Sequence, residues 1–80
     1  MTKLKIVSWN VNSVRARADI VGRLLDEEQP DILCLQETKA LDTVFPAQLF
    51  HSRGYVHHEL NGQKMHHGVA IASSTLLRML

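Results

Sequence analysis

Residues 31–37, Asp-Ile-Leu-Cys-Leu-Gln-Glu, place four consecutive apolar side chains between polar ends. Such a short apolar run is typical of a β-strand buried on both faces of a sheet. The apolar residues before it, at positions 16, 20, 21, 24 and 25, have helical spacing, which predicts a helix over residues 14–28. Ser13 is the expected N-cap of this helix, and Pro30 stops it.

The segment before the helix, residues 4–11, alternates along the chain and predicts a further strand. One face would carry Leu4, Ile6, Ser8 and Asn10, and the other Lys5, Val7, Trp9 and Val11. A strand, a helix and a buried strand in succession predict a βαβ unit of the α/β class. The right-handed crossover rule makes its two strands parallel, so their carboxyl ends share one edge of the sheet.

The remainder of the chain predicts a hairpin. Residues 45–50 have the pattern of a short helix or ordered turn, and Gly54 closes it before a strand at residues 55–60. Asn61-Gly62 is a hairpin signal, and residues 68–72 are the matching strand. Residues 73–80 have a helix-like or connecting pattern.

The composition is that of one folded domain. The chain has 80 residues, of which 45% are hydrophobic and 21% charged, and its net charge is +1. This charge is too small for a strongly basic nucleic-acid module, so any contact with a polyanion must be local. Cys34 has no cysteine partner and apolar neighbours, so it is expected to be an inert core thiol in a reducing, cytoplasmic setting. Neither a signal peptide nor a membrane-spanning segment is predicted.

Asn10, Asn12 and Glu37 are expected to gather at the shared edge of the two parallel strands. Carboxylate and amide oxygens are hard ligands that suit Mg²⁺ or Mn²⁺. Two plainer interpretations stay open. Glu37 could be solvated or paired with Lys39, and the asparagines could serve only to close turns.

Arg15, Arg17 and Lys39 lie near the same predicted edge and could hold phosphates, or they could form an ordinary solvated face. The histidines at positions 51, 57, 58, 66 and 67 lack the spacing of a zinc site. Trp9 is expected to fill the core and not to stack on a base.

Three segments carry a resemblance to a known family: residues 8–17, Ser-Trp-Asn-Val-Asn-Ser-Val-Arg-Ala-Arg; residues 30–39, Pro-Asp-Ile-Leu-Cys-Leu-Gln-Glu-Thr-Lys; and residues 67–71, His-Gly-Val-Ala-Ile. Together they resemble the opening of the bacterial exonuclease III family, within the endonuclease/exonuclease/phosphatase superfamily. The resemblance implies a four-layer α/β sandwich, in which two packed sheets lie between helices. It also implies Mg²⁺-dependent hydrolysis of phosphodiester bonds in duplex DNA, by 3′ to 5′ exonuclease action and by incision at abasic sites, performed by a monomer.

The same resemblance assigns roles to individual residues. Glu37 matches the family's metal-binding glutamate, Asn10 its catalytic asparagine beside the metal, and Asn12 a neighbouring position that is Asn or Asp in relatives. Arg15 and Lys39 match positions near the DNA backbone. The sequence departs from the family at Ser13, where many relatives have Gly, and at Met65-His66, where a Gly-aromatic or Gly-His pair is common.

Members of the family are much longer than this chain. Residues 1–80 are therefore expected to be the N-terminal portion of a single such domain, without the later motifs that supply the remaining catalytic groups. Alone, the chain is expected to be inactive and marginally stable, because its sheet would expose an edge and a face. Two alternatives remain: a superfamily phosphoesterase for another substrate, such as an inositol phosphate or sphingomyelin, and a non-catalytic α/β interaction module.

Overall fold

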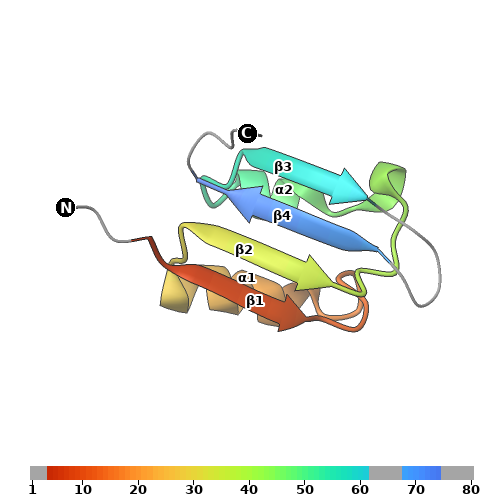
Figure 1. Ribbon diagram of the computed structural model, residues 1–80, viewed down its shortest axis with the longest axis horizontal. Helices are drawn as coiled ribbons and strands as arrows, with labels where there is room; N and C mark the ends of the chain where they lie inside the picture. Colours follow the sequence, from red (N-terminus) through yellow and green to blue (C-terminus); the bar gives the residue numbers. More distant parts are fainter. Residues whose placement is uncertain (1–3, 62–67, 75–80) are drawn as a thin grey trace.

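The computed structural model describes residues 4–61 and 68–74, which form one four-stranded sheet with helices behind it (Figure 1). In chain order the elements are β1 (Ile6–Asn10), α1 (Ala18–Glu28), β2 (Ile32–Gln36), the 3-10 helix η1 (Asp42–Val44), α2 (Ala47–His51), β3 (His57–Asn61) and β4 (Val69–Ser73). The strand order in the sheet is β1-β2-β4-β3. No helix within the described residues is long and apolar enough to cross a membrane.

The predicted βαβ unit is confirmed. β1 and β2 are parallel, in a register that runs from Ile6 opposite Ile32 to Asn10 opposite Gln36. α1 lies behind these two strands and connects them (Figure 1).

The predicted hairpin is also confirmed, since β3 and β4 are antiparallel neighbours. β4 additionally pairs with β2, again antiparallel, and so occupies an inner position of the sheet. Of the predicted Asn61-Gly62 turn, the structure describes only Asn61, which ends β3. Residues 62–67 lie outside the described part of the chain.

The predicted start of the long helix is wrong. α1 begins at Ala18, and its N-cap Arg17 makes no side-chain capping bond. The Ser13 hydroxyl instead accepts a 3.2 Å hydrogen bond from the Ala16 N–H, so it caps the turn that precedes α1. The N–H groups of Ser13 and Val14 are bonded to the chain that follows β2, which holds this segment out of the helix.

Four further boundaries differ from the predictions. β1 begins at Ile6 and β3 at His57, each two residues later than predicted. Ser73 belongs to β4 and not to a helix, while residues 75–80 lie outside the described residues. The short helix predicted at residues 45–50 is α2, which spans Ala47–His51, and the separate 3-10 helix η1 precedes it.

One face of the sheet packs on the helices, and the other is open. The core contains Leu33 and Leu35 of β2 and Ala70 and Ala72 of β4, together with buried residues of the helices, and Trp9 packs against it as predicted. On the open face Ile6 is 58% exposed and Val69 48% exposed.

β2 is therefore buried on one face and only half-buried on the other, which corrects the prediction for residues 31–37. Because side chains alternate along a strand, Cys34 lies opposite to Leu33 and Leu35. It is half-buried on the open face, between Ser8 and Ile71, and is not a core thiol.

Candidate active site

The segments that follow β1 and β2 run on side by side at the carboxyl edge of these strands. The Ser13 N–H donates to the Glu37 carbonyl over 2.9 Å, and the Val14 N–H donates to the Thr38 carbonyl over 3.0 Å. The Thr38 N–H in turn donates to the carbonyl of Gly68, just before β4, over 3.1 Å. Thr38 is buried. Its sequence context does not indicate a role at this edge, because a threonine between Glu and Lys carries no distinctive pattern.

Asn10 and Glu37 meet at this edge, as the sequence predicts. The Nδ2 amide of Asn10 donates a 2.7 Å hydrogen bond to Oε2 of Glu37. Since Asn10 uses its amide N–H here, its carbonyl oxygen Oδ1 is the atom that it can offer to a cation. The edge therefore presents a carboxylate and an amide oxygen next to each other.

Asn12 is paired differently. Its Oδ1 accepts a hydrogen bond from the ammonium group of Lys39. The plainer interpretation that joined Lys39 to Glu37 is thus not what the structure shows. The predicted site divides into two pairs, Asn10 with Glu37 and Asn12 with Lys39.

The backbone at this edge is unusually rich in left-handed residues. Asn12, Ser13, Glu37 and Lys39 have φ angles of 50°, 85°, 53° and 54°. Each such residue with a side chain costs roughly 1–2 kcal/mol, and backbone strain of this kind clusters at functional sites. The φ of Ser13 also gives a physical reason why glycine would suit this position.

The predicted phosphate-binding cations lie on the turn after β1 and beside the second pair. Arg15 is exposed and Arg17 half-buried, and neither forms an ion pair within the described part of the chain. Lys39 is half-buried and shared with Asn12. Within the described residues, neither guanidinium group is therefore committed to a carboxylate.

The donor set fits part of a Mg²⁺ site. Mg²⁺ in proteins commonly takes one or two carboxylates and keeps several waters. Glu37 supplies a carboxylate and Asn10 an amide oxygen, whereas the described residues contain no cluster of three or more His, Cys, Asp or Glu side chains. Additional carboxylate ligands would have to come from outside these residues.

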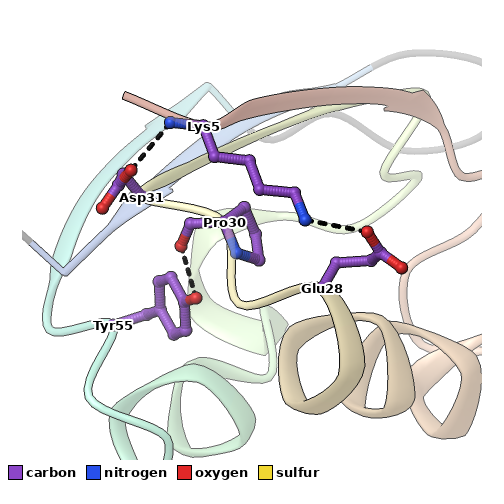
Figure 2. Close-up of polar contacts among 5 residues, drawn as sticks. All are labelled: Lys5, Glu28, Pro30, Asp31 and Tyr55. Carbon is purple, nitrogen blue, oxygen red and sulfur yellow. Dashed lines mark hydrogen bonds and ion pairs between the residues drawn. The ribbon is translucent and has the colours of Figure 1, made fainter. Parts of the chain in front are cut away.

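At the opposite end of β1 and β2, polar contacts tie separate parts of the chain together (Figure 2). There the Lys5 backbone N–H donates to Asp31 over 2.7 Å, its ammonium group lies 2.9 Å from Glu28, and the Tyr55 hydroxyl donates to the Pro30 carbonyl over 2.5 Å. A hollow of about 430 Å³ opens beside it, but its Arg53 and Asp26 are already paired with each other at 3.0 Å. Its polar groups thus serve internal contacts, which separates it from the open edge that carries Glu37.

Comparison with known proteins agrees with the resemblance. Residues 7–80 match the model of the Endonuclease/Exonuclease/phosphatase family. The chain is 40% identical over 70 residues to exodeoxyribonuclease III of Haemophilus influenzae, which covers 85% of this chain and 25% of that protein. It is 46% identical over 57 residues to the DNA repair nuclease APEX1 of Danio rerio, covering 68% of this chain and 18% of that protein.

Solved structures of similar proteins share the fold. An AP endonuclease from Archaeoglobus fulgidus superposes with a TM-score of 0.84 at 51% identity, over 90% of this chain and 28% of that one. The 3′ phosphatase NExo (D146N) from Neisseria, bound to a product DNA hairpin, gives 0.86 at 43% identity, over 92% of this chain and 28% of that one. The chain spans 18–28% of the length of these relatives. With nearly all of its residues matched by the family model, the chain belongs to the endonuclease/exonuclease/phosphatase family.

Proposed function

We propose that residues 1–80 are the N-terminal portion of a single domain that hydrolyses phosphodiester bonds in duplex DNA, acting at abasic sites and at 3′ ends. The observation that carries the proposal is the Asn10–Glu37 pair at the carboxyl edge of β1 and β2. The relatives named above, an AP endonuclease and an exodeoxyribonuclease III among them, support this substrate class. The protein would act as a cytoplasmic monomer without a membrane partner.

In this proposal Glu37 holds a Mg²⁺ ion, with Mn²⁺ as a possible substitute, and Asn10 is the catalytic residue beside it. A bound divalent ion neutralises charge on a phosphate and makes a bound water more acidic. Asn10 fixes the direction of the Glu37 carboxylate through its 2.7 Å hydrogen bond. Asn12 is the third candidate ligand, and its oxygen becomes available to a metal only when Lys39 moves to another partner.

The cationic side chains would hold the DNA backbone. Arg15 and Lys39 are the proposed DNA contacts, with Arg17 beside them. Such contacts position the duplex without reading its sequence. Because the net charge of the chain is only +1, contact with DNA would be confined to a few cationic side chains such as these. Contacts that do not read sequence suit a nuclease that recognises a lesion or an end.

The experiment is cleavage of a duplex with one abasic site, in Mg²⁺, by this chain and by a protein in which it continues past Leu80. We expect no cleavage by the 80-residue chain and cleavage by the longer protein. Glu37→Gln in the longer protein should lower the rate by about a hundredfold or more, because even groups that only support a metal ligand contribute 10–100-fold.

Glu59→Gln is the matched control, because Glu59 is an exposed carboxylate on β3 with no part in the site. Its rate should stay that of the unmodified protein. Full activity of Glu37→Gln would contradict the metal role of Glu37. Cleavage by the 80-residue chain itself would show that the residues outside it are dispensable.

A further inference from the structure

Four aromatic rings form one cluster with His58 at its centre, and they come from the link between η1 and α2, from α2 and from β3. The ring of His58 stacks on that of His51, with centroids 4.8 Å apart and planes 25° apart. The rings of Phe45 and Phe50 meet His58 edge to face at 6.0 and 5.7 Å, and they stack on each other at 5.2 Å. His51 is the last residue of α2, and His58 is the second residue of β3, so the cluster joins the helix to the edge strand.

The protonation of His58 is constrained by its partners. Its Nε2 lies 2.9 Å from the Tyr55 carbonyl, which can only accept, so Nε2 carries a proton and Nδ1 is bare in the neutral ring. Burial lowers the pKa of His58, the bond to Tyr55 acts in the opposite sense, and the nearby His51 and His57 lower it further. Of these two histidines, only His51 touches the ring of His58.

We propose that the His51–His58 stack is a proton-sensitive joint between α2 and β3. The joint is closed while at most one of the two rings is charged, and it loosens when both are charged, because two stacked cations repel each other beside buried aromatic rings. Phe50 is 0% exposed and Phe45 9% exposed, so loosening the joint would admit water to the core on this side of the sheet.

The direction of the pH dependence follows from the lowered pKa of His58. The folded chain prefers neutral His58, so the stabilisation is complete above the ordinary histidine pKa of about 6.5. It is lost as the pH falls through the lowered pKa of the folded state, since the unfolded chain then binds more protons. Acid should therefore loosen α2 from β3 in this window.

The test is an NMR titration of the imidazole ring signals of this chain, of His51→Gln and of His57→Gln. His57 is the matched control, because it lies beside His58 on the same strand but is absent from the ring cluster. We expect the pKa of His58 to be low in the unmodified chain. It should rise in His51→Gln, and rise less in His57→Gln.

The joint itself is followed by hydrogen exchange of the Tyr55 N–H, which donates to the Phe50 carbonyl over 2.9 Å at the end of α2. Its protection should fall on going from neutral to mildly acidic pH, by about tenfold for each unit by which the His58 pKa is lowered. His51→Gln should weaken this fall. A His58 that titrates at its ordinary pKa, or one that responds equally to His51→Gln and His57→Gln, would overturn the proposal.

Discussion

Asn10 donates a 2.7 Å hydrogen bond to Glu37, and this single contact joins the end of β1 to the first residue after β2. The two residues are 27 positions apart, and the parallel register of β1 and β2 brings them together. A neutral amide beside a carboxylate leaves one negative charge at this point of the edge. The Asn10 amide does not repel the Glu37 carboxylate, so the two side chains can stay in contact when no cation is bound.

Asn10→Asp should replace this contact by a repulsion between two carboxylates. We expect the free energy of unfolding to fall by about 1 kcal/mol or more, because like charges at this distance repel by that amount even in water. Mg²⁺ should restore the lost stability, since two adjacent carboxylates bind Mg²⁺ better than a carboxylate and an amide do. Urea unfolding with and without Mg²⁺ measures both effects.

Asn61→Asp is the control for this substitution, because Asn61 is exposed at the end of β3 and shares a row of the sheet with Asn10. It should change stability little and should gain nothing from Mg²⁺. An equal response of both variants to Mg²⁺ would mean that the ion acts on the sheet edge in general and not on the Glu37 site.

Two substitutions of Lys39 test whether the left-handed backbone of the candidate site is maintained in solution. Lys39→Gly and Lys39→Ala both remove the contact with Asn12, so the difference between them isolates the φ of 54°. The glycine variant should be more stable by roughly 1–2 kcal/mol, because only glycine adopts this conformation freely. Thermal or urea unfolding of the pair measures the difference.

The same two substitutions at Gln48 should give the opposite order. Gln48 is an exposed residue of α2, where glycine is less favourable than alanine by about 1 kcal/mol. If alanine is also the more stable residue at position 39, the left-handed conformation is not maintained in solution.

Tyr55→Phe should cost about 1–2 kcal/mol of unfolding free energy, because the buried Tyr55 hydroxyl donates to the Pro30 carbonyl and phenylalanine leaves that carbonyl without this donor. The substitution should also remove a pH effect. Burial, followed by the charges of Asp31 and Asp26, raises the pKa of Tyr55 above 10.0. The folded chain thus keeps a phenol proton that the unfolded chain releases.

It follows that the unmodified chain should lose stability as the pH rises above 10.0 and through the raised pKa of Tyr55. Tyr55→Phe should lack this particular loss. Unfolding measured across the alkaline range compares the two chains, and identical alkaline profiles would refute the role assigned to Tyr55.

Lys5→Met should raise the pKa of Glu28 toward its ordinary value of 4.5. The hydrogen bond and charge of Lys5 lower that pKa in the unmodified chain. The stabilisation that this exposed pair provides is present above pH 4.5 and is lost as the pH falls through the lowered pKa. A carboxyl NMR titration measures the change at Glu28.

Arg23→Met is the control for Lys5→Met. It breaks the neighbouring 3.6 Å ion pair with Glu27 on the same helix and should leave Glu28 unchanged. A Glu28 pKa that moves equally in both variants would point to a general change of charge on α1.

The sequence by itself determined the elements and the edge at which the candidate site lies. The helical spacing of α1 and the alternation in β1 are local patterns, and a strand, a helix and a strand can close on each other in essentially one way. Asn10 and Glu37 were therefore predicted to meet, and they do. The hairpin of β3 and β4 followed from local signals in the same way.

Only the tertiary structure decided which groups at that edge pair with one another. The backbone bonds from Ser13 to Glu37 and from Val14 to Thr38 delay the start of α1 and hold residues in left-handed conformations. They also accompany the pairing of Asn12 with Lys39, 27 positions away. Periodicity describes which face of a strand a residue occupies, whereas these contacts join irregular segments after the strands, where periodicity no longer applies.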